Sequence, residues 1–87
     1  MAEAGYTRDV RGVPLWLLRE YLTELGGQGG GDEVSGPGWA ARLTRLAAYQ
    51  IGSLRVGEVR VELEGEARAV ARIGAALDQK LNTRGGG

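Results

Sequence analysis

The chain has 87 residues, which is enough for a single small domain over residues 1–87 and leaves no room for a second hydrophobic core. Its 11 basic and 11 acidic residues give a formal net charge of zero, a balance that argues against a general nucleic-acid binder. The sequence has neither cysteine nor histidine, which excludes disulfides, thiolate catalysis, cysteine-ligated metal and a histidine general base.

No apolar segment approaches the roughly 18 residues of a membrane span, and the N-terminal sequence has no signal-peptide core. We therefore expect a cytoplasmic protein that does not bind membranes. All basic residues except Lys80 are arginine, which is typical of a GC-rich genome and is a weak marker of a thermophile.

Residues 5–12 predict a short extended segment, in which Tyr6 and Val10 occupy alternating positions. Arg8 and Arg11 precede the first helix, whose N-terminus attracts anions, and they are candidates for an anion contact. The preferred interpretation is an edge strand whose charged residues oppose aggregation.

Pro14 predicts the start of a helix. An N–H in the first turn has no partner within the helix, so proline, which lacks the N–H, is tolerated there. Leucines then recur at the three- and four-residue steps of a stripe that faces a core, at Leu15, Leu18, Leu22 and Leu25. Gly26 and Gly27 end this helix, since glycine adopts the left-handed conformation without a steric penalty.

Residues 26–38 contain seven glycines and one proline, a composition that predicts a flexible loop. A phosphate-binding loop would need a lysine and would lead from a strand into a helix. This segment follows a helix and has no basic residue, and Asp32 and Glu33 would repel a phosphate.

From residue 39 to residue 64 the hydrophobic period becomes that of a strand. Residues 39–51 predict at least one strand, although a helical start near Ala40 also fits. A half-buried strand is predicted where apolar residues alternate with charged ones, at Val59, Val61 and Leu63.

The alternation changes phase at two glycines. Across Gly57 and Glu58 the change suits a two-residue hairpin turn with glycine in the first position. A second change at Gly52 and Ser53 fits another turn or a bulge. The sequence leaves open which pair forms the main turn.

A turn at Gly57 would place Arg55 and Arg60 opposite each other, among glutamates at Glu58, Glu62 and Glu64. We interpret this mixed-sign ladder as a protected sheet face or a subunit interface, with both arginines as candidate interface residues. An acid–base pair or a cation site in these carboxylates is less favoured, because a solvated sheet face has the same pattern more often.

The last element is a helix over residues 65–81, with an apolar stripe at Val70, Ile73, Leu77 and Leu81. Gly74 within it suggests the close approach of another element. Asn82 is the expected stop, and residues 83–87 are predicted to be a disordered tail. Gly86 and Gly87 are candidates for the reactive tail of a ubiquitin-like carrier. Fraying is preferred, because such carriers end in a strand and this chain ends in a helix.

Trp16 and Trp39 are the largest apolar groups, and we expect them to pack in the core or in a dimer interface. The element order is β-α-β-β-β-α, with room for one further strand before the last helix. It predicts an α+β two-layer domain, in which two helices cover one face of an antiparallel sheet.

Two stretches, RGVPLWLLREYLTELGG at 11–27 and IGSLRVGEVRVELEGEARAV at 51–70, resemble the C-terminal domain of MoaD-related proteins. These proteins are relatives of the small, sulfur-carrying subunit of molybdopterin synthase, and in them this domain of undetermined function follows a ubiquitin-like carrier domain. The resemblance implies a TBP-like curved sheet with two helices, and it brings no catalytic residues. The chain is too short to hold the carrier domain as well.

The preferred hypothesis is a non-enzymatic accessory or interaction domain with no catalytic, cofactor or metal site. We expect it to form a homodimer and to have a protein partner in molybdopterin or sulfur transfer. One alternative is a ubiquitin-like sulfur carrier that uses its C-terminal Gly-Gly. The other is a small-ligand or anion-binding module that uses the concave side of the sheet.

Overall fold

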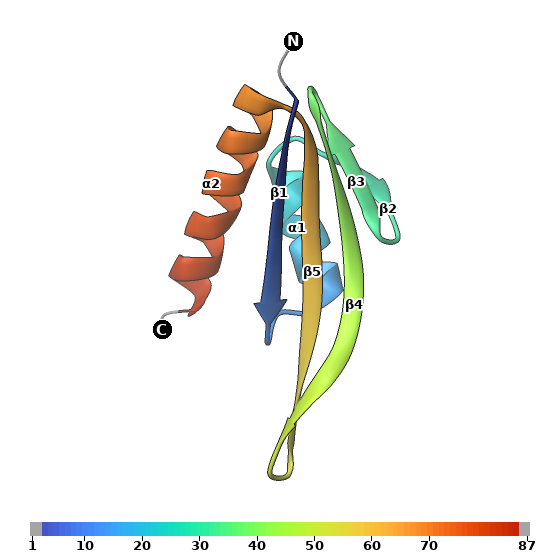
Figure 1. Cartoon of the computed structure of the whole chain (residues 1–87), viewed down its shortest axis with the longest axis vertical. Helices are drawn as coiled ribbons and strands as arrows, with labels where there is room; N and C mark the ends of the chain where they lie inside the picture. The colour runs from blue at the N-terminus through green and yellow to red at the C-terminus, as the bar shows by residue number, and fades with distance from the viewer. Residues whose placement is uncertain (1–2, 86–87) are drawn as a thin grey trace.

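The computed structural model describes residues 3–85 as a two-layer domain, in which two helices lie on one face of an antiparallel sheet (Figure 1). The sheet has five strands in the order β1-β5-β4-β3-β2. In chain order the elements are β1 (Glu3–Arg11), α1 (Leu15–Glu24), β2 (Gln28–Gly30), β3 (Glu33–Gly36), β4 (Trp39–Ile51), β5 (Leu54–Glu66) and α2 (Ala67–Gly85). The predicted α+β architecture is confirmed, and the sheet includes the optional further strand.

The centre of the sheet is β5, which pairs antiparallel with β1 on one side and with β4 on the other. Its side chains Val59, Val61 and Leu63 are no more than 4% exposed, which confirms the predicted half-buried strand. The neighbouring β4 is extended from Trp39 onward, so the alternative of a helical start near Ala40 is wrong.

Both helices are held on the sheet by their apolar stripes. Their fully buried side chains, each 0% exposed, are Leu18 and Leu22 of α1 and Ile73 and Leu77 of α2. Burial of one such side chain contributes about 1.5–3 kcal/mol. The first helix begins after Pro14 and ends before Gly26, whose φ of 103° lies in the left-handed region, as the sequence predicts.

The flexible loop predicted over residues 26–38 is wrong, because this segment contains the paired strands β2 and β3, and β3 pairs in turn with β4. Two of its glycines, Gly27 and Gly36, are required by packing against Trp39, which is 3% exposed. A Cβ on Gly27 would lie 2.8 Å from the Trp39 ring, and a Cβ on Gly36 would lie 2.6 Å from it. Glycine thus lets the backbone lie directly against a buried indole.

The turn between β4 and β5 is formed by Gly52 and Ser53, and the hairpin turn predicted at Gly57 is wrong. Gly52 has a φ of 60°, which suits the first central residue of a type II′ turn. Gly57 lies inside β5, opposite a β-bulge in β4. The alternation of apolar and polar residues changes phase at Gly57 because the outer part of β5 extends beyond the helices, so neither of its faces is buried against the core (Figure 1).

With this register, the predicted contact between the two arginines of β5 is also wrong. Arg55 is paired with Gln50 of β4, and Arg60 is paired with Thr44. The two arginines therefore lie at different levels of one strand.

The last helix continues through Gly85, beyond the stop predicted at Asn82. Residues 83–85 of the predicted disordered tail are thus helical, and residues 86–87 lie outside the described residues. Within residues 3–85, no helix combines the length and the apolar character needed to cross a membrane.

Candidate functional site

The sheet face that carries no helix presents alternate side chains of the strands to solvent (Figure 1). We call it the open face. Its side chains are Thr7, Asp9 and Arg11 of β1, Glu58, Arg60, Glu62 and Glu64 of β5, Ala40, Arg42 and Thr44 of β4, and Glu33 and Ser35 of β3. The predicted face of alternating glutamates around Arg60 is therefore present.

Ion pairs join neighbouring strands along the open face. Arg60 donates from Nε and Nη2 to the Asp9 carboxylate, at 2.9 and 3.2 Å. These hydrogen bonds lower the pKa of Asp9 and raise the pKa of Arg60. Arg11 donates to Glu58 at 3.3 Å. Because these pairs are exposed, they order the side chains and neutralise charge more than they stabilise the fold.

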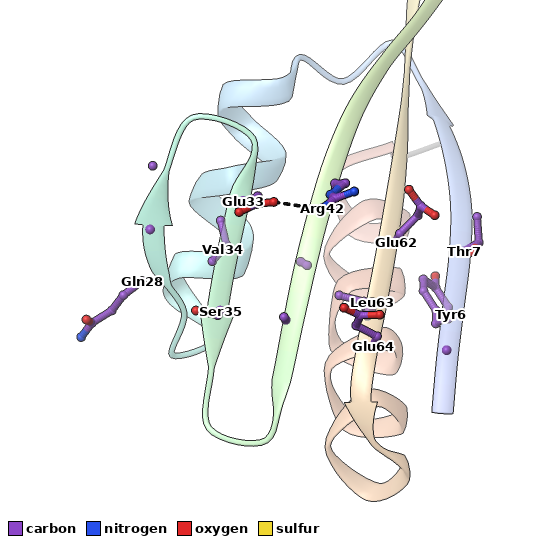
Figure 2. A pocket seen from close by; sticks show the side chains of 15 residues that line it. Tyr6, Thr7, Gln28, Glu33, Val34, Ser35, Arg42, Glu62, Leu63 and Glu64 are labelled. Carbon is purple, nitrogen blue, oxygen red and sulfur yellow. Dashed lines mark hydrogen bonds and ion pairs between the residues drawn. The ribbon is translucent and has the colours of Figure 1, made fainter. Parts of the chain in front are cut away.

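The open face is hollowed where β2 and β3 join the sheet, and the hollow has a volume of about 690 Å³ (Figure 2). Its charged side chains are Glu33, Arg42, Glu62 and Glu64, and Arg42 donates to Glu33 at 3.1 Å. Three carboxylates and one guanidinium give the hollow a formal charge of −2. The lining also includes residues with little or no side chain, which are Gly5, Gly29, Gly30, Ala40 and Ala41.

At the other end of the sheet, the β4–β5 hairpin projects as a two-stranded arm (Figure 1). We define the arm as residues 47–57, because β1 pairs with β5 only from Glu58 onward and β3 pairs with β4 only up to Arg42. At its tip Ile51 and Leu54 lie opposite each other and are 62% and 66% exposed. An isolated two-stranded hairpin is marginally stable in water, so a partner that covers this tip would stabilise it.

The predicted interface residues lie in different parts of the molecule. Trp39 belongs to the core, and its indole Nε1 has no hydrogen-bond partner among the described residues. Trp16 lies on α1 and is 56% exposed. Arg60 lies on the open face and Arg55 lies on the arm. Trp16, Arg55 and Arg60 therefore stay accessible to a partner, whereas Trp39 does not.

Arg8 and Arg11, the candidates for an anion contact, are not brought together. They lie three residues apart on a strand and so point to opposite sides of the sheet. Arg8 donates to Asp78 of α2, and Arg11 donates to Glu58 on the open face. The candidate tail residues, the last two glycines of the chain, lie outside the described residues.

Sequence reasoning missed a polar cluster between β1 and α2. The Tyr6 hydroxyl and the Arg8 guanidinium both donate to Oδ1 of Asp78. Burial and then the bond to Asp78 raise the pKa of Tyr6, and the bond to Asp78 raises the pKa of Arg8. The signal in the sequence is Gly74, since a Cβ there would lie 3.2 Å from the Tyr6 ring, which confirms the predicted close approach. The cluster attaches the edge strand to the last helix.

Three surface features of the described residues are candidate binding surfaces. Within residues 3–85, no three side chains of the metal-ligating types lie close enough together to hold a metal ion. The features that remain are the acidic hollow, the ion-paired part of the open face and the arm with its apolar tip.

The family relationship is decided by a match to the whole domain. The family described as archaeal MoaD-like protein matches residues 6–87, which extend from β1 to the C-terminal residue. The chain belongs to the archaeal MoaD-like family. The predicted relation to MoaD-related proteins is confirmed at this level. No curated protein matches this archaeal MoaD-like chain.

Proposed function

We propose that this archaeal MoaD-like chain is a non-enzymatic interaction domain that acts as a homodimer and assists a MoaD-type sulfur carrier. The observation that carries the proposal is the open face, which has an acidic hollow at one end and an arm with an apolar tip at the other. Neither surface is covered by another part of the described chain. Protein-binding sites commonly combine exposed apolar side chains, as Ile51 and Leu54 are here, with ordered polar groups.

The composition supports binding over catalysis. The sequence has neither of the residue types, histidine and cysteine, that most often act as general base or as activated nucleophile near neutral pH. Its formal charge of zero leaves no net repulsion between two copies. The ion pairs of the open face hold the charged side chains in defined positions, as recognition requires.

Two measurements on the full chain test this proposal. Sedimentation equilibrium should show a dimer, and titration calorimetry should show binding to a purified MoaD-type sulfur carrier from the same source. The pair Glu62→Lys and Glu64→Lys should weaken carrier binding or dimerisation. The matched control is Arg68→Glu with Arg72→Glu, because these arginines are exposed on α2, away from the open face. A chain that stays monomeric and does not bind the carrier would contradict the proposal.

A second candidate function is that of the sulfur carrier itself, and one observation favours it. The family match extends to residue 87 and so includes the terminal Gly85, Gly86 and Gly87. Incubation with a carrier-activating enzyme and ATP, followed by mass spectrometry of the intact chain, tests this function. An adenylate or thiocarboxylate on Gly87 would establish a carrier, and an unchanged mass under conditions that activate a known carrier would exclude it.

A further inference from the structure

We propose that the outer edge of β1 pairs with β1 of a second copy, antiparallel and centred on Thr7, so that two sheets join into one continuous sheet. The inference rests on the proposed homodimer and names the surface that forms it. The two-fold axis then stands perpendicular to the sheet at Thr7. Both helix layers lie on one side of the joined sheet, and both open faces stay accessible on the other.

The two edges of the sheet differ in length. The edge strand β2 has three residues, whereas the edge strand β1 has nine and extends over about 30 Å. The outer N–H and C=O groups of β1 have no strand to pair with among the described residues, because β1 stands at the end of the strand order. Figure 2 shows the strand of Tyr6 and Thr7 as the outermost of the sheet, with α2 behind the sheet. A long edge of this kind is a template for another strand.

The backbone of β1 is regular over its whole length. It contains no proline and no β-bulge, since its register with β5 is continuous from Glu3 to Arg11. Proline, bulges and charges that point towards the core are features that commonly block an edge. The one charged side chain of β1 on the helix side is Arg8, and Asp78 neutralises it. The strand is therefore competent to pair along its full edge.

Symmetry limits the registers that two copies of β1 can adopt. Two antiparallel edge strands related by a two-fold axis perpendicular to the sheet have the same residue opposite itself at the axis. The middle residue of β1 is Thr7, so an axis there pairs the whole strand. Glu3 of each copy then lies opposite Arg11 of the other, on the open side of the sheet. Opposite charges thus meet at both ends of the shared ladder, which stabilises it.

The charges of β1 oppose the neighbouring registers. An axis at Tyr6 places Glu3 opposite Asp9. An axis at Arg8 places two arginines opposite each other, and an axis at Asp9 does the same with two aspartates. Each of these shifts juxtaposes like charges, which destabilises a strand pair, and axes nearer either end shorten the paired stretch. The charged residues therefore favour the register at Thr7 and discourage the other pairings that lead to aggregation.

Glu3 has a like charge beside it within its own chain. It lies opposite Glu66 of β5, and no ion pair of the described residues includes either carboxylate. Arg11 of a second copy would place a cation beside these two carboxylates. The side chain of Arg11 is 57% exposed and binds Glu58 through Nε, and a guanidinium with its five N–H donors can serve more than one carboxylate. Charge complementarity thus commits the edge of β1 to another copy of itself.

The helix layer leaves room for this approach. Asp78 reaches Tyr6 of β1, so its flank of α2 is the one nearest the free edge. Ala71, Ala75 and Asn82 share this flank by helical spacing, and all three are exposed. In the joined sheet these flanks of the two α2 helices lie next to each other, and side chains as small as alanine do not obstruct the pairing.

Cysteine cross-linking tests the contact directly, because the chain has no cysteine of its own. Thr7→Cys should form a disulfide-linked dimer on mild oxidation. Directly opposite Cα atoms of an antiparallel pair lie about 4.5–5.5 Å apart, which is within the range of a disulfide. The matched control is Thr44→Cys, an exposed threonine of β4 on the same open face, which should not cross-link. Cross-linking of Thr44→Cys without that of Thr7→Cys would place the contact on the open face and overturn the proposal.

A charge exchange gives an independent readout, the dimer dissociation constant measured by sedimentation. Glu3→Arg and Arg11→Glu each place like charges opposite each other at both ends of the ladder, and each should weaken the homodimer about tenfold. A mixture of the two variants should form a heterodimer of nearly wild-type affinity, because opposite charges then meet again at both ends.

The same variant separates dimer contact from damage to the fold. At a concentration where the chain is monomeric, Glu3→Arg should raise the melting temperature, because it removes the repulsion from Glu66. Circular dichroism shows that each variant is folded. Equal affinity of the single variants and of their mixture would contradict the register.

The outcomes distinguish this inference from the proposed function. A dimer that Thr7→Cys does not link and that Glu3→Arg does not weaken overturns the pairing of β1 and leaves the homodimer intact. A chain that sediments as a monomer at every concentration overturns both.

Discussion

The packing of Trp39 between glycines leads to a prediction that distinguishes a paired hairpin from a flexible loop. Gly36 and Gly30 both lie in residues 26–38, and neither has a positive φ. A Cβ on Gly36 would lie 2.6 Å from two atoms of the Trp39 ring, whereas a Cβ on Gly30 would have nothing within 4 Å. Gly36→Ala is the perturbation, and Gly30→Ala is its matched control.

The expected effects follow from packing and from the unfolded state. Overpacking destabilises the folded state by about 1–3 kcal/mol. Replacing glycine by alanine also restricts the backbone of the unfolded chain, which stabilises the protein by about 0.4–1 kcal/mol. Gly36→Ala should therefore lower the free energy of unfolding by about 1–2 kcal/mol, because a 3% exposed indole cannot move into solvent cheaply. Gly30→Ala should be neutral or stabilise the chain by up to about 1 kcal/mol.

Urea denaturation followed by far-ultraviolet circular dichroism, at a single protein concentration, measures both values. The difference between the variants should be about 2 kcal/mol, or roughly 8–16 °C in melting temperature for a domain of this size. If the two variants have equal stability, the segment is not packed against Trp39, and the reasoning is refuted.

Three further predictions concern the polar cluster, the open face and the core. Because the pKa of Tyr6 is raised in the folded state, the protonated Tyr6 hydroxyl stabilises the fold fully below the ordinary value of 10.0, and this stabilisation is lost as the pH rises through the higher folded pKa. The melting temperature of a Tyr6→Phe variant should therefore lack this alkaline loss. The lowered pKa of Asp9 means that the wild-type advantage over Asp9→Asn should be present above pH 3.8 and should disappear as the pH falls through the folded pKa. An advantage that persists at lower pH would contradict the Arg60 pair. Leu22→Ala should lower the free energy of unfolding, measured by urea denaturation, by about 2–5 kcal/mol, because Leu22 is 0% exposed. Leu17→Ala should lower it clearly less, because Leu17 is half-buried.

The sequence by itself determined the local elements whose signal lies in hydrophobic periodicity and capping residues. The leucine stripe between Pro14 and Gly26 predicts α1, and the alternation at Val59, Val61 and Leu63 predicts the buried part of β5. The same alternation predicts that Glu62 and Glu64 share the open face with Arg60. These properties follow from periods of 3.6 and 2 residues, which each segment carries without reference to its neighbours.

Only the tertiary structure decided which distant segments meet. The pairing of β1 with β5 gives Arg60 its partner Asp9, and the packing of β1 on α2 brings Tyr6 to Asp78. The glycine-rich segment has the composition of a loop, yet it pairs as a hairpin in which Gly27 and Gly36 lie against the Trp39 ring. Contacts of this kind depend on strand register and on the shape of the core, and neither quantity is a property of one stretch of sequence.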